Sequence, residues 1–313
     1  MNKIFEGDCI EGMKNLPDKS VNCCVTSPPY FGLRDYGHEG QIGLEETPEQ
    51  FVTKLVDVFR EVKRVLRDDG TLWLNLGDTY WGGGWRGAVF NEKSGDMQKG
   101  SKGTYGGENI KNATGKHDLY KSKDLIGIPW MVAFALRADG WYLRQDIIWH
   151  KPNPMPESVT DRCTKSHEYI FLLSKSQKYW YDHEAIKQAM IGEPHKPGNK
   201  ATSDAGHLRN DVGTDRMEKV WGEDGMANKR SVWTVTTKPY SEAHFATYPP
   251  DLIVDCIKAG CPEGGIVLDP FMGAGTTAMV ARKLNRNYVG FELNPEYIKI
   301  AQNRLQTELG IFQ

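Results

Sequence analysis

The chain has 313 residues, of which 39% are hydrophobic and 26% are charged, and its formal net charge is −2 at pH 7. This length allows one large buried core. The sequence has no apolar stretch long enough to span a membrane, and its beginning lacks the apolar segment of a signal peptide. A net charge so close to zero does not by itself indicate a nucleic-acid-binding protein.

The cysteines and histidines do not form the patterns of disulfide-rich or zinc-binding proteins. The six cysteines include no C-x-x-C pair, which is typical of reduced thiols in a cytoplasmic protein. His150, His167 and His183 lack the spacing of metal ligands. We therefore expect a cytoplasmic protein without a bound metal.

Predicted helices and strands alternate along the chain. Thr47 is a suitable N-cap and Pro48 a suitable first residue for a helix that ends at 68–70. In chain order, the predicted elements up to residue 182 are strands at 3–5 and 21–25, the helix from Thr47, a strand at 71–76, a helix at 124–137, and strands at 141–149 and 169–173. This order favours an α/β fold with a largely parallel sheet.

Two segments interrupt the alternation. Residues 81–123 are rich in Gly, Lys, Ser and Asn, and we predict a long mobile surface loop. Residues 183–238 are polar with little periodicity, and we predict an inserted lobe outside the sheet. The alternation then resumes with helices and strands over residues 249–313.

Residues 26–30 read Thr-Ser-Pro-Pro-Tyr and directly follow a predicted strand. Pro28 and Pro29 lack N–H groups and have a fixed φ, so they end the strand and stiffen the backbone. A hydroxyl, free carbonyls and an aromatic ring at a rigid strand end suit a planar guest that carries an amino group. An isolated sequence of this kind is more often a simple turn, so its meaning depends on the rest of the chain.

A second motif lies near the other end of the chain. Residues 266–277 read as a strand, an acid at Asp269, a glycine loop with Gly273 and Gly275, and the start of a helix. The spacing differs from a phosphate-binding P-loop, and an acid there would repel pyrophosphate. Glu292 ends the next predicted strand, where a carboxylate can bind ribose hydroxyls. These residues suit an adenosine-like ligand with a positively charged end that is not a phosphate. S-adenosylmethionine, with its sulfonium and amino group, is such a ligand.

The two motifs together resemble the catalytic and cofactor motifs of DNA amino-methyltransferases, which methylate exocyclic amines of cytosine or adenine. The catalytic motif comes first, as in the permuted β class of this family. The resemblance implies a Rossmann-like methyltransferase fold with a mostly parallel central sheet, a circularly permuted motif order and an inserted target-recognition lobe. It also implies S-adenosyl-L-methionine as the cofactor and double-stranded DNA as the substrate.

Other segments are similar to the same family. Residues 6–9 resemble its strand end near the cofactor adenine, and residues 148–154 and 166–171 resemble later sheet segments. Residues 244–249 resemble the segment that packs on the cofactor. The resemblance implies four catalytic residues, Ser27, Pro28, Pro29 and Tyr30. It implies these cofactor-binding residues: Asp8, Cys9, Phe245, Thr247, Asp269, Phe271, Gly273, Gly275, Thr276, Thr277, Glu292 and Asn294.

The resemblance also divides the chain. Residues 1–182 would form the catalytic part, with the 81–123 loop, and residues 239–313 would form the cofactor-binding part. Residues 183–238 would read the DNA sequence. Within the 81–123 loop we expect Trp81, Trp85 and Tyr105 to contact DNA. The family is found in bacteria, archaea and phages, and the sequence leaves open a homodimer and a companion restriction endonuclease.

The implied chemistry is a direct attack by an aromatic amine on a sulfonium methyl group. Ser27 and the Pro28 carbonyl would accept hydrogen bonds from the amine and free its lone pair, while Tyr30 would stack on a base flipped out of the duplex. Methylation of a cytosine ring carbon instead uses a cysteine, typically after a proline. This chain has no Pro-Cys dipeptide.

The residue before the prolines bears on the target base. Family members with Ser there mostly modify cytosine N4, and those with Asp mostly modify adenine N6. A hydroxyl can donate and accept a hydrogen bond, so Ser27 can also bond the cytosine ring nitrogen. We therefore expect a cytosine-N4 enzyme, with adenine-N6 methylation as the alternative.

Two further readings stay open at this point. One is a non-catalytic DNA-binding relative, against which the intact Ser27, Tyr30, Asp269 and Glu292 argue. The other is a methyltransferase that acts on protein glutamine or RNA. Those enzymes typically have Asn before the prolines and place the glycine loop first, and both features are reversed here.

Overall fold

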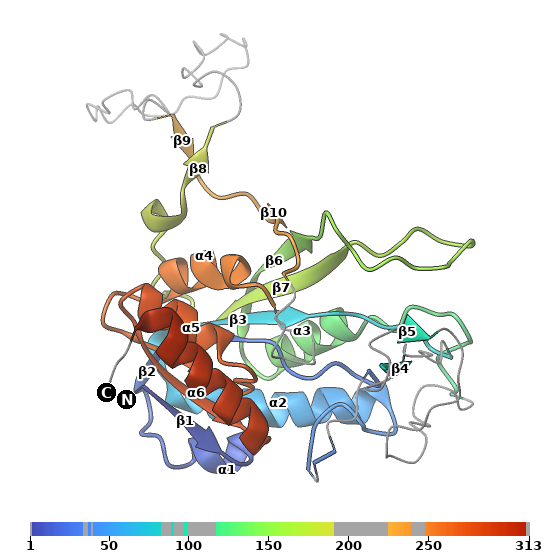
Figure 1. The fold of residues 1–313 in the computed structure, drawn as a ribbon, viewed down its shortest axis with the longest axis horizontal. Coiled ribbons are helices and arrows are strands. Elements are labelled where there is room, and N and C mark those ends of the chain that lie inside the picture. Colours follow the sequence, from blue (N-terminus) through green and yellow to red (C-terminus); the bar gives the residue numbers. More distant parts are fainter. Residues whose placement is uncertain are drawn as a thin grey trace, which may run out of the picture.

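The computed structural model describes residues 2–33, 37–38, 40–82, 117–190, 225–238 and 248–310, together with the backbone of 89–90 and 97–98. Its centre is an eight-stranded sheet flanked by helices (Figure 1). The strands run in the order β1-β12-β11-β2-β3-β7-β6-β10. They are β1 (Lys3–Glu6), β2 (Val21–Thr26), β3 (Leu66–Leu76), β6 (Tyr142–His150), β7 (His167–Ser174), β10 (Val232–Thr234), β11 (Ile266–Asp269) and β12 (Asn287–Glu292).

Within the described ranges, six helices cover the two faces of the sheet. They are α1 (Cys9–Met13), α2 (Pro48–Val65), α3 (Ile128–Ala138), α4 (Pro250–Gly260), α5 (Thr276–Lys283) and α6 (Pro295–Leu309). One buried apolar cluster contains residues of α1, α2 and α3, and a second contains residues of α4, α5 and α6. The sheet therefore lies between two helix layers, which confirms the predicted α/β fold.

Short elements complete the described chain. They are β4 (Val89–Phe90), which pairs with β5 (Met97–Gln98), β8 (Gln188–Ala189), which pairs with β9 (Met226–Ala227), and the 3₁₀ turn η1 (Glu184–Ile186).

Helix α2 begins as the sequence predicts. The Thr47 hydroxyl accepts a hydrogen bond from the Gln50 amide at 3.2 Å, and Pro48 is the first helical residue. The predicted stop at 68–70 is wrong, because the helix ends at Val65 and β3 begins at Leu66. Leu66 pairs with Val21 of β2, and the register then shifts, so residues 67–70 belong to an irregular strand start.

All strand pairs in the sheet are parallel except those of β7, which runs antiparallel to both β3 and β6. The carboxyl ends of β1, β2, β3, β6, β11 and β12 consequently lie along one edge of the sheet. The reversed β7 begins at that same edge with His167 and Glu168, which pair with His150 and Trp149 at the end of β6. We call this the carboxyl edge.

Two predictions for the interrupting segments are wrong. Val232–Thr234 pairs with β6 and forms the last strand of the sheet, so the 183–238 segment is not wholly outside the sheet. Trp81 is buried and stacks on Tyr120, with ring centroids 5.5 Å apart, so it is not an exposed DNA contact. Trp85 and Tyr105 lie outside the described residues, as does most of the 81–123 segment.

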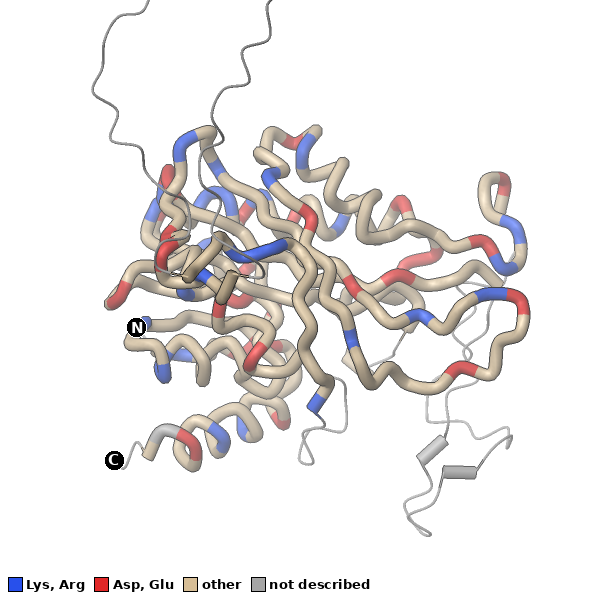
Figure 2. Tube along the Cα trace, turned by 90° about the horizontal axis from the view of Figure 1, so that it is seen from above, with Lys and Arg blue, Asp and Glu red and all other residues tan. Residues whose placement is uncertain are grey.

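The surface charges are mixed. Figure 2 shows Lys and Arg interspersed with Asp and Glu along the described chain, in keeping with the net charge of −2. None of the described helices is long and apolar enough to cross a membrane. All six cysteines are free thiols. Over the described ranges, no group of three or more His, Cys, Asp and Glu side chains is placed to bind a metal ion.

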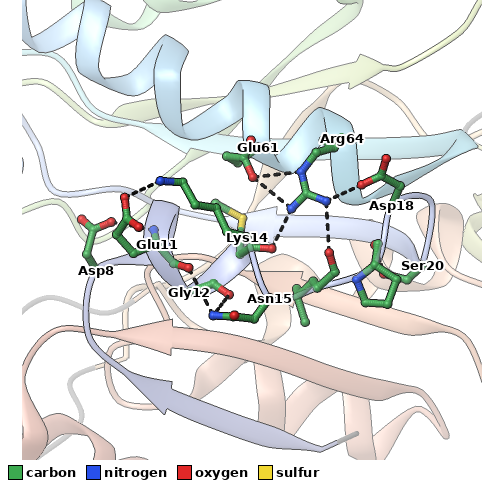
Figure 3. A network of polar contacts seen from close by, with 12 residues as sticks. Asp8, Glu11, Gly12, Lys14, Asn15, Asp18, Ser20, Glu61 and Arg64 are labelled. Carbon is green, nitrogen blue, oxygen red and sulfur yellow. Dashed lines mark hydrogen bonds and ion pairs between the residues drawn. The ribbon is translucent and has the colours of Figure 1, made fainter.

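A network around Arg64 fixes the short helix α1 against α2 (Figure 3). The Arg64 guanidinium donates to the carbonyl oxygens of Met13 at 2.7 Å and Leu16 at 3.0 Å. It also forms ion pairs with Asp18 and Glu61. Because α1 directly follows the end of β1, this network also fixes the carboxyl edge at β1.

Candidate active site

The fold brings the two sequence motifs together at the carboxyl edge. Strand β2 ends at Thr26, directly before Ser27, and lies beside β11, which ends at Asp269. The Thr26 hydroxyl donates a 2.6 Å hydrogen bond to Asp269 Oδ1, although the two residues are 243 positions apart. The strand ends that precede the Ser-Pro-Pro-Tyr turn and the glycine loop are therefore bonded to each other.

Asp269 is the centre of a buried polar cluster and is only 1% exposed. Besides Thr26, its carboxylate accepts hydrogen bonds from the Thr277 hydroxyl at 2.5 Å, the Tyr248 hydroxyl at 3.2 Å and the Phe271 amide at 3.0 Å. Tyr248 and Thr277 also bond each other. Burial raises the Asp269 pKa, while these hydrogen bonds act in the opposite direction.

Asp269 thus fixes the strand ends around the site. Its carboxylate is buried among donors of the protein itself. Thr277 and Thr276 are anchored in the same way, since Thr276 Oγ1 accepts a 2.9 Å hydrogen bond from the buried Arg304. The first turn of α5 still offers backbone N–H groups that the helix itself does not use.

Glu292 holds the glycine loop from the next strand. Its two carboxylate oxygens accept hydrogen bonds from the backbone amides of Gly273 and Asn294, both at 2.8 Å. Burial raises the Glu292 pKa, and the two amide bonds oppose that rise. Each carboxylate oxygen has a further lone pair, so Glu292 can also accept hydrogen bonds from a ligand.

The glycine loop needs its glycines for two different reasons. Gly275 has a φ of +76°, and a Cβ there would lie 2.8 Å from the Ala301 Cβ of α6. Gly273 has a φ of +52°, but among the described residues a Cβ there would meet only the Phe271 carbonyl oxygen at 4.0 Å. The loop is therefore packed against α6 at Gly275 and uncrowded at Gly273, where a ligand can approach the backbone.

Asp8 and Cys9 follow the end of β1, which lies beside β12 in the sheet. β1 pairs in parallel with β12, and Glu6 is opposite Glu292. The Asp8 carboxylate caps α1 by accepting a 2.9 Å hydrogen bond from the Glu11 amide. Cys9 is buried, and burial raises its pKa to about 12, so its thiol is neutral and packs as an apolar group.

The Ser-Pro-Pro-Tyr turn follows β2, which lies on the opposite side of β11 from β12. Pro28 is buried, and Ser27, Pro29 and Tyr30 are partly buried. The Tyr30 ring lies against Gly77 at the end of β3, where a Cβ would be 2.5 Å from Tyr30 Cε2.

The Tyr30 hydroxyl reaches across the sheet. It donates a 2.7 Å hydrogen bond to Glu168 Oε2 of β7 and lies 3.3 Å from Asn75 Oδ1.

The structure adds five residues to those that the sequence singled out. Thr26 and Tyr248 bond Asp269, Asn75 and Glu168 bond the Tyr30 hydroxyl, and Lys151 bonds Glu168. Thr26, Lys151, Glu168 and Tyr248 stand inside segments that resemble the family, which was the available signal. Phe245 and Thr247 lie outside the described residues.

Known proteins resemble this chain along most of its length. Residues 21–303 match the DNA methylase family N6_N4_Mtase. The chain is 48% identical to the type II methyltransferase M.Cfr9I of Citrobacter freundii, over 97% of this chain and 88% of the relative. It is 47% identical to the type II methyltransferase M.SmaI of Serratia marcescens, over 97% of this chain and 90% of the relative.

Solved structures show the same fold. The cytosine-N4-specific PvuII DNA methyltransferase matches with a TM-score of 0.63 and 16% identity, over 96% of this chain and 85% of that protein. The M1.HpyAVI–SAM complex matches with a TM-score of 0.54 and 20% identity, over 97% of this chain and 99% of that protein. At such low identity these likenesses concern the fold. The family match and the high identity to its relatives confirm the resemblance seen in the sequence: the chain belongs to the N6_N4_Mtase family of DNA methylases.

Proposed function

We propose that this protein transfers a methyl group from S-adenosylmethionine to the N4 amine of a cytosine in double-stranded DNA. The observation that supports this most is the Thr26–Asp269 hydrogen bond of 2.6 Å, which fixes Ser27 beside the glycine loop. A methyl acceptor held at the turn would therefore lie next to a methyl donor held at the loop. The PvuII enzyme, which shares the fold, is named as cytosine-N4-specific.

The residues present suit S-adenosylmethionine. Glu292, with its spare lone pairs, would accept hydrogen bonds from the ribose hydroxyls, and the uncrowded backbone at Gly273 would approach the ligand. Asp8 and Cys9 would border the adenine, as the resemblance implies, and Asn294 fixes Glu292. When bound, this group supplies an electrophilic methyl.

Ser27 and Pro28 would prepare the amine. The lone pair of an exocyclic amine is delocalised into the ring, so hydrogen-bond acceptors at the NH₂ group favour the attacking geometry. The Ser27 hydroxyl and the Pro28 carbonyl are those acceptors in our proposal. Since a hydroxyl also donates, Ser27 can also bond the cytosine ring nitrogen. The choice of cytosine over adenine rests on the resemblance, because family members with Ser at this position mostly modify cytosine N4.

The buried Cys9, Cys23 and Cys24 do not suit a covalent mechanism. Burial raises the pKa of Cys9 to about 12 and the pKa values of Cys23 and Cys24 well above their ordinary value. Thiols of this kind stay protonated and are poor nucleophiles. Direct attack by the amine needs no such nucleophile.

Residues 183–238 are our candidate for the target-recognition region, between a catalytic part at 1–182 and a cofactor-binding part at 239–313. β10 joins the end of this region to the sheet beside β6, and Thr237, near the end of the region, bonds both the side chain and the backbone of Asn153. The region would thus be tethered at the carboxyl edge. Since its relatives are type II methyltransferases, we propose that the protein protects DNA from a companion endonuclease.

The test is methyl transfer from labelled S-adenosylmethionine to DNA, followed by digestion to nucleosides. We expect N4-methylcytosine. Mostly N6-methyladenine would contradict the choice of base, and no transfer would favour a non-catalytic DNA-binding relative.

A matched pair of variants tests the catalytic turn. Ser27→Ala should lower the transfer rate by about 100-fold, the order of effect seen when one preorganised polar group is removed. Ser20→Ala is the control, because Ser20 is also partly buried and precedes the strand that Ser27 follows. Equal rates for the two variants would show that Ser27 does not take part.

A further inference from the structure

The contacts of Tyr30 point to a second layer of residues behind the catalytic turn. Its hydroxyl donates to Glu168 Oε2 at 2.7 Å, and the Asn75 amide donates to the same oxygen at 3.2 Å. The other carboxylate oxygen, Oε1, forms an ion pair with Lys151. Glu168 therefore receives donors from the turn after β2, from β3 and from the residue after β6.

This cluster is well shielded from water. The side chains of Lys151 and Glu168 are 18% and 15% exposed. The Lys151 ammonium also lies 4.2 Å from the centre of the Trp149 ring, whose N–H donates to the Val235 carbonyl at 2.8 Å. A phenol bonded to a shielded carboxylate makes a strong, directional hydrogen bond.

The position of the Tyr30 ring is fixed at both ends. The hydroxyl end is bonded to Glu168, and the ring edge lies against Gly77, where even a methyl group would overlap it. A ring held in this way presents one surface to a ligand at the turn, with little rotational freedom left to lose on binding.

We propose that Glu168, charge-balanced by Lys151, is a positioning residue that fixes the Tyr30 ring against the target base. This role rests on the proposed function, in which Tyr30 stacks on the flipped base. Glu168 acts through Tyr30 and not on the reacting atoms. It should therefore affect the rate of methyl transfer to bound DNA and leave the affinity for S-adenosylmethionine unchanged.

A purely structural ion pair is the competing explanation, and the chain offers a matched control for it. Lys229 and Asp255 form another partly buried ion pair, with side chains 26% and 23% exposed. The Lys229 ammonium also lies over a tryptophan, 5.4 Å from the centre of the Trp233 ring. Asp255 is on α4 and has no contact with Tyr30 among the described interactions. Asp255→Asn thus removes an equivalent ion pair away from the turn.

The experiment compares wild type, Tyr30→Phe, Glu168→Ala, Glu168→Gln, Asp255→Asn and the double variant Tyr30→Phe/Glu168→Ala. Single-turnover methyl transfer to plasmid DNA is measured at saturating S-adenosylmethionine, together with the Kd for S-adenosylmethionine. We expect Glu168→Ala to slow transfer by about tenfold, and Glu168→Gln, which keeps an acceptor oxygen, to recover most of that loss. The Kd should change less than about twofold in every variant.

The double variant gives the sharpest result. If Glu168 acts through Tyr30, the double variant should be no slower than the slower single variant, within about twofold. The positioning role would be overturned if the double variant slowed transfer by the product of the two single effects. It would also be overturned if Asp255→Asn slowed transfer as much as Glu168→Ala. A wild-type rate in Glu168→Ala, while wild type methylates DNA, would overturn it as well. A wild-type protein without any transfer activity would overturn the proposed function and this role with it.

Discussion

The carboxyl edge has two halves that are built differently. The cofactor half contains Asp269, the glycine loop, Glu292 and the end of β1, and the catalytic half contains the Ser-Pro-Pro-Tyr turn with the partners of Tyr30. In the cofactor half, Asp269 and Glu292 bond groups from their own neighbourhood in the chain, such as Phe271, Thr277 and Asn294. In the catalytic half, Tyr30 depends on Glu168, which is 138 residues away. Around the glycine loop, the cofactor half is thus organised by local sequence. The catalytic half depends on the order and direction of strands. Thr26–Asp269 is the bond that joins the two halves.

The largest effect should come from breaking the cluster that joins the halves. Asp269→Ala removes the acceptor of the buried Thr26 hydroxyl and one partner each of the Thr277 and Tyr248 hydroxyls, which should lower the free energy of unfolding by about 3 kcal/mol or more. Urea denaturation measures this change in the free energy of unfolding. Asp269→Asn keeps the shape and one acceptor oxygen, so it should cost less. Equal losses in both variants would mean that the hydrogen bonds do not stabilise the fold.

Two glycines allow the halves to be disturbed separately. In Gly77→Ala the new Cβ would lie 2.5 Å from the Tyr30 ring, and in Gly275→Ala it would lie 2.8 Å from Ala301 in a backbone that disfavours a side chain. Gly77→Ala should lower kcat by about tenfold with cofactor affinity unchanged. Gly275→Ala should weaken cofactor binding by about tenfold or more. Calorimetry and steady-state kinetics measure both. The same defect in both variants would contradict two separable halves.

Arg64 tests whether local packing fixes the β1 end of the cofactor half. Arg64→Ala removes donors to two backbone carbonyls and should destabilise the protein by about 2 kcal/mol. The control Arg67→Ala removes only a more exposed ion pair with Asp69, and should cost less than about 1 kcal/mol. If thermal unfolding shows no difference between the two, the network of Figure 3 is not stabilising.

The smallest expected effect is the pH dependence of the stability that Glu292 contributes. Burial raises the pKa of Glu292, so its contribution to stability is present below the ordinary glutamate pKa and is lost as the pH rises through the raised value. The stability difference between wild type and Glu292→Gln should therefore fall as the pH rises from about 4.

Glu308 supplies a control of opposite sign. Its hydrogen bond to Lys283 lowers its pKa, so its contribution is lost as the pH falls through the lowered value. The difference between wild type and Glu308→Gln should fall toward acid. Both differences are measured by urea denaturation across the pH range. If the difference for Glu292→Gln and the difference for Glu308→Gln changed with pH in the same direction, these assignments would be contradicted.

The sequence predicted the cofactor half better than the catalytic half, because the glycine loop is organised locally whereas the surroundings of Tyr30 depend on long-range strand pairing. Asp269, the glycine loop and Glu292 lie in one strand–loop–helix–strand unit whose pattern is readable along the chain. The partners of Tyr30 were missed because β7 runs antiparallel, which brings Glu168 to the carboxyl edge. Strand direction and the position of Val232–Thr234 at the sheet edge are set by long-range pairing, which short-range patterns do not contain.

Modified-base sequencing of DNA from cells that express the protein tests the central claim most directly. We predict N4-methylcytosine at one short recognition sequence, and its loss from cells that express Ser27→Ala instead. N6-methyladenine at such a sequence, or DNA without any modified site, would contradict the account.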